Sequence, residues 1–467
     1  MSITSTLSLA GEALKAQQLA LQTTGHNLAN LATPGYSRQN VDFVAAPPAF
    51  EGGVLLGQGV KVDGIKRIVD QFNEAQLLSL NGNVGYADAQ SQALTSVQDA
   101  FPTSGGINDA LSAFFGSLSD LANNPSGTAE RVSVIGKANA LGQSLAQTRQ
   151  IIASEQQNLD SNLAGAVQQV NNLLSQIASL NQRILSSQGE GQSPNDALDQ
   201  RQTLLQQLTK LTGATTRQEA DGEVTVSVGG LLLVGGNRFA ALNTDGVNAA
   251  GLHQITYESP SEGISLDATS LLNQGTIGGI VSTRDNQLQS TLDRLDQFAK
   301  TLVDQVNTQH ALGFDLTGAA GGNFFTPIAT TAGAAGNVQV DSAIVADPRR
   351  IAAAAAADTV PGDNRNALAL VNLQSTAFPT LGGLTLQDSF LSLAGDVGSQ
   401  VQNAQTQSDF QQQLLTQAQA RRDSVSGVNT DEEMIKLIEF QRAFESSALL
   451  IRTADQMYQS LVDMVQS

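Results

Sequence analysis

Apolar residues recur every seven positions near the N-terminus of the chain, at Leu7, Leu14, Leu21 and Leu28. A seven-residue repeat is typical of a helix whose apolar seam packs against a second helix. The segment Thr33-Pro34-Gly35-Tyr36 follows, and proline cannot continue a helix while glycine readily turns. The pattern therefore predicts a helix from about residue 3 to residue 31, paired with another helix.

The C-terminal segment carries a matching repeat. Thr430-Asp-Glu-Glu433 predicts a capping box in which Thr430 begins the helix and Glu433 reaches back to it. A second apolar stripe adds more surface than one partner helix can cover, so we expect further partners. The predicted seam consists of Leu437, Phe444, Ile451, Tyr458 and Val465, and the second stripe includes Phe440, Leu450, Met457 and Leu461.

Four more segments in the middle of the chain have helical periodicity. They span about residues 128–186, 193–213, 279–310 and 386–425. The second begins at Ser193-Pro194 and stops at Gly213, and the last begins at Thr385-x-x-Asp388, all common helix boundary signals. Together they predict an elongated helical bundle.

Residues 214–259 change to an alternating, glycine-punctuated pattern. Asp221-Gly222 is a strong hairpin signal before the alternating run 223–228, and 231–234 and 254–257 are further strand candidates. Gly57-Gln-Gly59 is interpreted as a turn into a strand. Two other predictions concern the region after residue 325: a loop with little to bury at 326–347, and a short helix at 352–357, because alanine favours helices.

The fold class predicted from these patterns is mainly α: an elongated helical bundle with terminal heptad helices paired as a coiled coil, plus a small inserted β domain. We expect a terminal coiled-coil domain of residues 1–50 with 427–467. A helical rod domain would comprise 51–212 with 273–426, and the small β domain 213–272.

The composition of the chain excludes several classes of function. The 467-residue chain has a formal net charge of −19, which offers no basic footprint for nucleic acid. It has no cysteine, which excludes disulfides and thiol chemistry. The first basic residue is Lys15 and no apolar run approaches a membrane span, so neither a secretory signal peptide nor membrane insertion is predicted. A cytoplasmic protein and one exported without cleavage both fit.

Catalytic arrangements are not evident in the sequence. His26, His253 and His310 lie in three different segments, and the acidic cluster Asp431–Glu433 is interpreted as a helix cap. We expect no catalytic, cofactor-binding or metal-binding residues. A cell-wall hydrolase with a hidden carboxylate pair, and a secreted effector or adhesin, are alternatives from other classes.

Motifs at both ends resemble those of the flagellar axial proteins, the rod, hook and hook-associated subunits. They are Asn27-Leu-Ala-Asn30, Thr33-Pro-Gly-Tyr-Ser-Arg38, Gln441-x-x-Phe444 and Thr453-Ala-Asp-Gln-Met457. The segments Ser426-Gly-Val-Asn429, Asn307-Thr-Gln-His310 and Gly362–Asn366 are similar to the hook-associated subunits in particular. The interval between residues 315 and 363 is short, so we expect an outer domain of longer relatives to be absent.

The resemblance implies a non-enzymatic structural subunit at the junction between flagellar hook and filament, outside the cell, exported without cleavage. The implied partners are further copies in a ring, the hook protein, the second junction protein and a cytoplasmic type III export chaperone. Another axial protein, of the hook or distal rod, is the nearest alternative. Asn30, Pro34, Gly35, Tyr36 and Asn429 belong to the family motifs, and Phe440, Leu450, Met457 and Leu461 are the chaperone-binding candidates.

Overall fold

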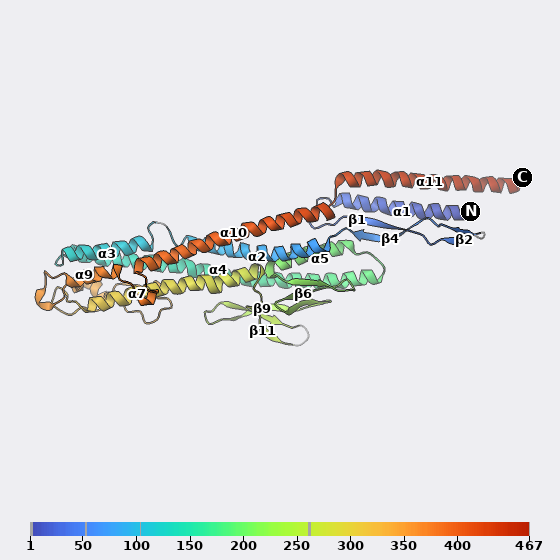
Figure 1. Cartoon of the computed structure of the whole chain (residues 1–467). Coiled ribbons are helices and arrows are strands. Elements are labelled where there is room, and N and C mark those ends of the chain that lie inside the picture. The colour runs from blue at the N-terminus through green and yellow to red at the C-terminus, as the bar shows by residue number, and fades with distance from the viewer. Residues whose placement is uncertain (1–2, 52–53, 103, 260–262, 467) are drawn as a thin grey trace.

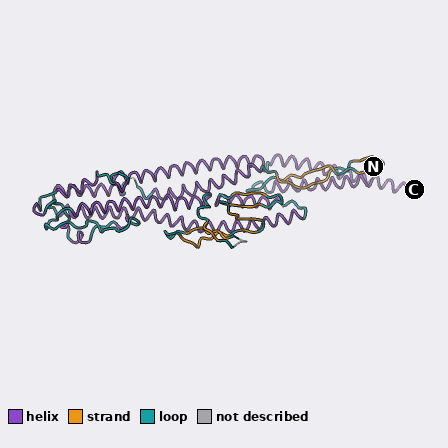
Figure 2. Tube along the Cα trace, turned by 60° about the horizontal axis from the view of Figure 1, so that its bottom comes forward, coloured by secondary structure: helices purple, strands orange, loops and turns teal. Residues whose placement is uncertain are grey.

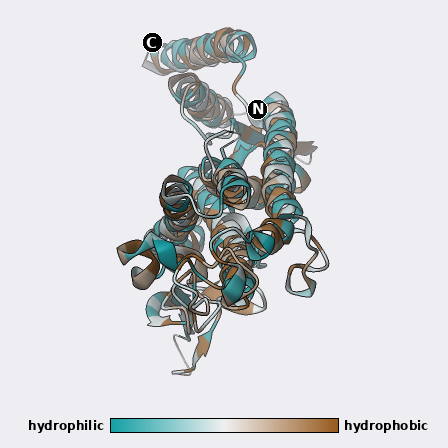
Figure 3. Ribbon diagram, turned by 90° about the vertical axis from the view of Figure 1, so that its left-hand side faces the viewer, coloured by the Kyte–Doolittle hydropathy of each residue, from teal (hydrophilic) through white to brown (hydrophobic). Residues whose placement is uncertain are grey.

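The computed structural model describes residues 3–51, 54–102, 104–259 and 263–466. Long helices run lengthwise and make the molecule a rod, with the two chain termini together at one end (Figure 1). Viewed along the long axis, the terminal pair of helices is displaced to one side of the other helices (Figure 3). The predicted fold class, a mainly helical elongated bundle with small antiparallel sheets inserted, is confirmed.

The helices are α1 (Ile3–Ala29), α2 (Gln71–Gln98), α3 (Ile107–Asn123), α4 (Thr128–Gly189), α5 (Asn195–Thr212), α6 (Gly275–Ser282), α7 (Gln289–Ala311), α8 (Ser342–Ala346), α9 (Arg365–Asn372), α10 (Leu386–Ser426) and α11 (Thr430–Gln466). A π-helical turn at Thr283–Leu288 joins α6 to α7. The strands are β1 (Gln39–Ala45), β2 (Ala49–Glu51), β3 (Val54–Leu56), β4 (Val60–Arg67), β5 (Thr215–Gln218), β6 (Val224–Val228), β7 (Leu231–Gly235), β8 (Arg238–Phe239), β9 (Ala241–Val247), β10 (His253–Glu258) and β11 (Ser265–Asp267).

Helix α4 is the spine of the rod. Its 62 residues extend about 93 Å at 1.5 Å per residue. Its apolar side is continuous with the main core, and α3, α5, α6 and α7 pack along it. At the end remote from the termini, the rings of Phe114, Phe324 and Phe325 meet with centroids 4.9–5.9 Å apart. A thin core shared by long helices follows from a sequence with 4% aromatic residues.

Helices α2 and α10 form a second antiparallel pair. Asn73 at the start of α2 donates to the carbonyl of Ala418 near the end of α10, and Asp88 accepts from Ser408. Sequence periodicity does not reveal α2, whose interior contains Gly82 and Gly85. A Cβ on Gly85 would lie 2.0 Å from the carbonyl oxygen of Lys210, so glycine is required for α2 to approach α5 so closely.

Two small antiparallel sheets lie on one side of the helices (Figure 2). Their strand orders are β5-β6-β7-β8 and β11-β10-β9, and the predicted strands at 223–228, 231–234 and 254–257 correspond to β6, β7 and β10. Asn181 on α4 holds the first sheet through the Val224 and Gly236 carbonyls. A separate hairpin, β1 with β4, extends toward the termini, and Gly59 turns into β4 as predicted.

The predicted helix at 352–357 is wrong. Ala352–Ala354 are buried in extended backbone, and Ala354 bridges to Phe314. The Ala352 amide donates to Nε2 of His310 at 2.9 Å, and its carbonyl accepts from Asn366 at 2.7 Å. Specific long-range hydrogen bonds here outweigh the intrinsic helical preference of alanine.

The segment 326–347 buries more than predicted. It is largely irregular, but Ala334, Ala335, Val338, Val340 and Ile344 are all buried. Asp296 on α7 accepts the amides of Gly333 and Ala335 at 2.7 and 2.9 Å and so holds the segment against the core. The expectation that this loop has little to bury is therefore corrected.

Protonation of His310 provides a test of the core at this end. His310 is fully buried, its Nδ1 lies 2.7 Å from the Gly322 carbonyl, and its Nε2 accepts from Ala352. Burial lowers the pKa of His310, nearby Arg131 lowers it further, and the Gly322 carbonyl and Asp315 oppose the shift. As the pH falls below about 6.5, His310 therefore takes up a proton in the unfolded chain while it stays neutral in the folded chain. The stability that neutral His310 contributes is complete above that pH and is lost as the pH falls below it.

We expect the free energy of unfolding to fall by up to about 1.4 kcal/mol per pH unit below about pH 6.5 through this group. Urea unfolding of the parent and of His310→Gln, at about pH 7.5 and about pH 5.5, measures the effect. The variant should have a shallower pH dependence, whatever its absolute stability. His26→Gln, which alters a half-exposed histidine, is the control, and equal slopes for His310→Gln and the parent would contradict the assignment.

Candidate assembly interface

Helices α1 and α11 pair antiparallel beyond the end of the rod, so both termini lie at the same extremity (Figure 1). The apolar residues that are fully buried in this part of the molecule are small, Ala10, Ala16 and Ala20 of α1 and Ala454 of α11, and Ser447 is buried with them. Small side chains allow two helices to approach closely, so larger residues of the seam flank the contact and remain half-buried.

The predicted seam residues occupy these flanking positions over most of the pair. Tyr458 is 56% exposed because it lies near the end of α11, and the side chain of Val465 lies outside the described residues. The assembly role of the whole set stays a prediction. The half-buried members are Leu7, Leu14, Leu21, Leu28, Leu437, Phe444 and Ile451.

Apolar side chains are exposed along α11, both on the side turned away from α1 and at the C-terminal end that extends beyond the start of α1. Among the chaperone-binding candidates, Leu450, Met457 and Leu461 are exposed, whereas Phe440 is half-buried with its ring 6.2 Å from that of Phe43 in β1. The exposed set on α11 comprises Met434, Ile435, Ile438, Leu449, Leu450, Met457, Tyr458, Leu461, Val462 and Met464. A surface of this kind, on a helix with one partner, is typical of a protein that associates with others.

A buried polar joint connects the terminal pair to the rod, and Asn27 is at its centre. Its Oδ1 accepts from the Tyr36 hydroxyl at 2.7 Å and from the Gln39 amide at 3.0 Å. Its Nδ2 donates to the Gln39 carbonyl and to Oε2 of Glu433, both at 2.8 Å. One amide therefore ties α1, the following loop, strand β1 and α11 together, with each buried polar atom paired.

Glu433 has a different role from the one predicted. Its carboxylate is buried, and Lys436 donates to Oε1 at 3.0 Å while Asn27 donates to Oε2. The N-cap of α11 is Asn429, whose side chain accepts from the amides of Asp431 and Glu432 at 2.9 and 3.3 Å. The predicted capping box from Thr430 is therefore wrong by one residue, and the acid joins the two terminal helices instead of closing the cap.

Tyr36 and the residues around it attach this joint to α5. Burial raises the pKa of Tyr36 well above its ordinary value, and the carboxylates of Asp196, Asp199 and Glu433 add to the effect, so the hydroxyl remains a donor. Asp199 accepts from the Ser37 amide at 3.0 Å and from Arg67 at 2.6 Å. The loop that stops α1 is thus fixed to the rod from two sides.

Arg422 near the end of α10 completes the joint. It donates to the carbonyls of Gly35 and Tyr36 at 2.9 and 3.1 Å and to Glu74 of α2 at 3.1 Å. Gly35 has φ of +80°, and a Cβ there would lie 2.4 Å from Oγ1 of Thr203. Only glycine fits both the backbone conformation and the space.

The other motif residues shape the turn. Asn30 donates to the His26 carbonyl and accepts from Thr33, both at 3.0 Å, while Pro34 is exposed beside α5. Sequence analysis did not single out Asn27, Arg422 or Asp199 as site residues. Asn27 lay within a quoted motif, but Arg422 and Asp199 have no local signal because their partners are distant in the chain.

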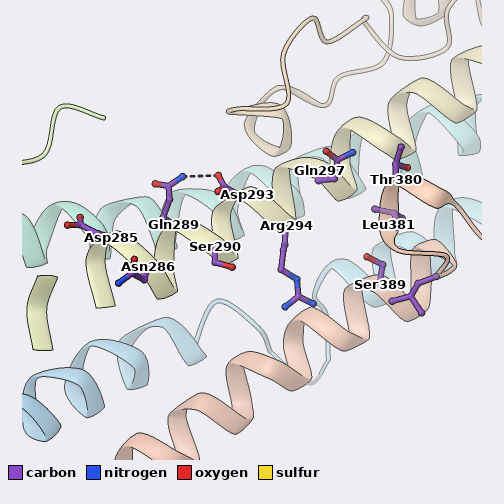
Figure 4. Close-up of a pocket in the computed structure, with 11 residues that line it drawn as sticks. Asp285, Asn286, Gln289, Ser290, Asp293, Arg294, Gln297, Thr380, Leu381 and Ser389 are labelled. Atoms are coloured by element: carbon purple, nitrogen blue, oxygen red, sulfur yellow. Dashed lines mark hydrogen bonds between the residues drawn. The ribbon is translucent and has the colours of Figure 1, made fainter. Parts of the chain in front are cut away.

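A cleft lies between α7 and the start of α10 (Figure 4). Its acidic groups are already paired, Asp285 with Arg284 and Asp293 with Gln289 at 2.8 Å. Within the described ranges, no three His, Asp or Glu side chains are placed to hold a metal ion. No helix among the described residues is long and apolar enough to cross a bilayer.

Three family models match the chain. The model of the flagellar hook-associated protein FlgK helical domain covers residues 94–325. The flagella basal body rod protein model covers 7–36, and the flagellar basal body rod FlgEFG protein C-terminal model covers 419–464. The two end models coincide with α1 and its turn and with the end of α10 and most of α11.

Full-length relatives agree with these matches. Flagellar hook-associated protein 1 of Escherichia coli (strain K12) is 27% identical over an alignment of 546 positions, covering 99% of this chain and all of the relative. The same protein of Bacillus subtilis (strain 168) is 29% identical, covering 98% of this chain and 97% of the relative. The structure of the flagellar hook junction protein FlgK from Burkholderia pseudomallei, at 18% identity, covers 75% of this chain with a TM-score of 0.68 and shares its fold.

The terminal helix pair and the helical rod therefore place the chain among the flagellar rod, hook and hook-associated proteins. Within that class it belongs to the family of flagellar hook-associated protein 1, to which it is similar from end to end. The alignment with the Escherichia coli relative is longer than the chain, so this chain lacks segments that the relative has.

Replacement of Asn27 by leucine should loosen the terminal pair. The change keeps the approximate volume but removes the Asn27 partner of Glu433 Oε2, of the Tyr36 hydroxyl and of the Gln39 backbone, at a cost of about 3 kcal/mol or more. We expect amide hydrogen exchange in α1 and α11 to increase strongly while exchange in α4 stays unchanged. Asn40→Leu, an exposed neighbour, is the matched control, and protection of α1 equal to the parent would contradict the role given to Asn27.

Replacement of Gly35 by alanine should destabilise the joint through two separate effects, the strained backbone and a steric clash. The positive φ costs about 1–2 kcal/mol for a residue with a Cβ, and the contact with Thr203 adds to it. Gly105→Ala, at a positive φ with open space around it, reports the first term alone. The melting temperature of Gly35→Ala should be lower than that of Gly105→Ala. Adding Thr203→Ala to Gly35→Ala should recover part of this difference. An unchanged melting temperature in the double variant would argue against the contact with Thr203.

Proposed function

We propose that this chain is the structural subunit that forms the junction between the hook and the filament of a bacterial flagellum, outside the cell. The observation that carries the proposal is the full-length similarity to flagellar hook-associated protein 1, in sequence and in order of segments. A non-enzymatic role accords with a molecule whose polar clusters join helices to one another.

We propose a separate role for each of the three domains of the molecule. We assign residues 1–50 with 427–467 to a terminal domain that associates with other subunits, because its exposed apolar stripe lies there. Residues 51–212 with 273–426 would form the rod that sets the spacing, and 213–272 a small β domain at its side. The polar joint around Asn27 would transmit the orientation of one part to the other.

Assembly with other flagellar components follows from membership of this class. The specific partners are part of the proposal: further copies in a ring, the hook protein on one side and the second junction protein on the other. A cytoplasmic export chaperone would cover the apolar stripe of α11 before export, with Phe440, Leu450, Met457 and Leu461 as candidate contacts. Three of these side chains are exposed and available for such contact.

A hook or distal rod subunit is the second candidate, because the two models that match the chain ends describe rod proteins. Immunogold microscopy of isolated hooks with filaments attached, using antibody to the β region around Glu223, separates the two. Gold confined to the hook–filament boundary supports the junction subunit. Gold along the hook or on the rod would overturn it and favour the second candidate.

Substitution of the outward stripe tests the assembly role without disturbing the fold. Ile435 is 66% exposed and Ile438 is 47% exposed, so Ile435→Asp with Ile438→Asp should leave the thermal unfolding of the monomer nearly unchanged. The same change should abolish incorporation into flagella and filament growth, because a charge cannot be buried without a partner.

The matched control is Val132→Asp with Leu368→Asp, two exposed apolar residues of the rod. Motility and immunoblots of isolated flagella measure incorporation. The control should assemble normally. Normal assembly of the Ile435 and Ile438 variant, or a large fall in its melting temperature, would contradict the proposed role of the stripe.

A further inference from the structure

The last part of α11 extends past α1 without a partner helix. The two helices have 37 and 27 residues and meet at Asn27 and Glu433, so about ten residues, roughly 15 Å, project beyond the start of α1. Figures 1 and 2 both show the C-terminus beyond the N-terminus. This projecting end is the segment from about residue 457 to residue 466.

The apolar seam continues along the projecting end. Tyr458 and Leu461 follow Ile451 and Ala454 by seven residues, so they lie on the face that α1 covers further back. Ala454 is buried against α1, whereas Leu461 is 48% exposed. The face of α11 that packs against a partner for most of its length is thus left uncovered at its end.

The tip of the neighbouring hairpin is uncovered in the same way. Phe50 of β2 is 72% exposed and Leu55 of β3 is 64% exposed, and the register pairs them with each other. Strands β2 and β3 lie at the same extremity as the described ends of α1 and α11 (Figure 1). Closer to the rod, the same hairpin places Phe43 against Phe440 of α11. Phe440 and Leu461 are three heptads apart, so the hairpin already packs an aromatic ring on this line of α11.

We propose that the hairpin tip of one copy of this chain, through Phe50 and Leu55, packs on the projecting end of α11 of a second copy, at Tyr458 and Leu461. Within one chain the tip leaves Phe50 exposed and so does not cover its own α11. Subunits side by side in a ring place equivalent features at equal height, and the tip and the projecting end share one extremity. The hairpin of the first copy would thus extend, along the same face of α11 in the second copy, the contact that α1 makes within one chain. The proposal rests on the proposed function, because the ring brings the copies together.

Disulfide crosslinking tests the contact, and the absence of cysteine from the chain makes the background clean. The full chain carrying Phe50→Cys and Leu461→Cys is expressed in cells, flagella are isolated and oxidised, and non-reducing gels are probed with antibody. We expect a ladder of dimers, trimers and higher species that reduction collapses to monomer. The matched control carries Phe50→Cys with Leu449→Cys, because Leu449 is exposed on the outward face of the same helix.

A monomer band alone from flagella that contain the protein would overturn the contact, since an internal disulfide adds no mass, and so would an equal ladder from the control. If the paired variant does not assemble, co-expression of the two single variants gives the same decision: a dimer supports the contact, and its absence overturns it. Antibody labelling of the same flagella separates the two proposals. Protein at the hook–filament boundary without crosslinks refutes the contact only, whereas protein elsewhere refutes the proposed function.

Discussion

The arrangement of the molecule depends on one buried amide, that of Asn27. Four hydrogen bonds from a single side chain join the end of α1 to the next loop, to β1 and to the start of α11. Such a group is expensive to bury unless every polar atom has a partner, so the arrangement that pairs all of them is strongly preferred over its neighbours. The neighbouring hydrogen bonds of Asp199 on α5 and Arg422 on α10 attach the same loop to the rod, so hydrogen-bond geometry sets the orientation of the terminal pair.

The rod and the terminal pair are held together by different kinds of contact. Along α4 the apolar core is continuous, and its large apolar residues are phenylalanine, leucine and isoleucine. In the terminal pair the buried residues are alanine, serine and threonine together with Asn27 and Glu433 of the polar joint, and the leucines of the heptad seam remain half-buried. The rod can thus be stable by itself, while the terminal pair retains apolar surface whose full burial needs further contacts. This difference accords with a subunit that arrives folded in its middle and completes its ends during assembly.

Sequence periodicity predicts the long helices well, because α1, α4, α5, α7, α10 and α11 each bury one face. It misses α3 (Ile107–Asn123) and also α2, where Gly82 and Gly85 weaken the helical signal but allow close packing. It also misplaces residues 352–357, where tertiary hydrogen bonds hold an extended chain. The motif that contains Asn27 is visible in sequence, but its partner Glu433 is 406 positions away, so the joint itself cannot be predicted from local patterns. The burial of Ala10, Ala16 and Ala20 is likewise less evident in the sequence than the leucine repeat beside them.

The same separation of 406 residues between Asn27 and Glu433 has a consequence for the order of folding. Helix α1 is synthesised long before α11, so α1 has no partner helix until α11 has been made. Closing so long a loop costs entropy that only an already folded rod can reduce, by bringing the two ends near each other. The terminal pair is therefore expected to be the last element to form and the first to open, so a force that pulls on α1 or α11 meets the least stable element of the described structure first.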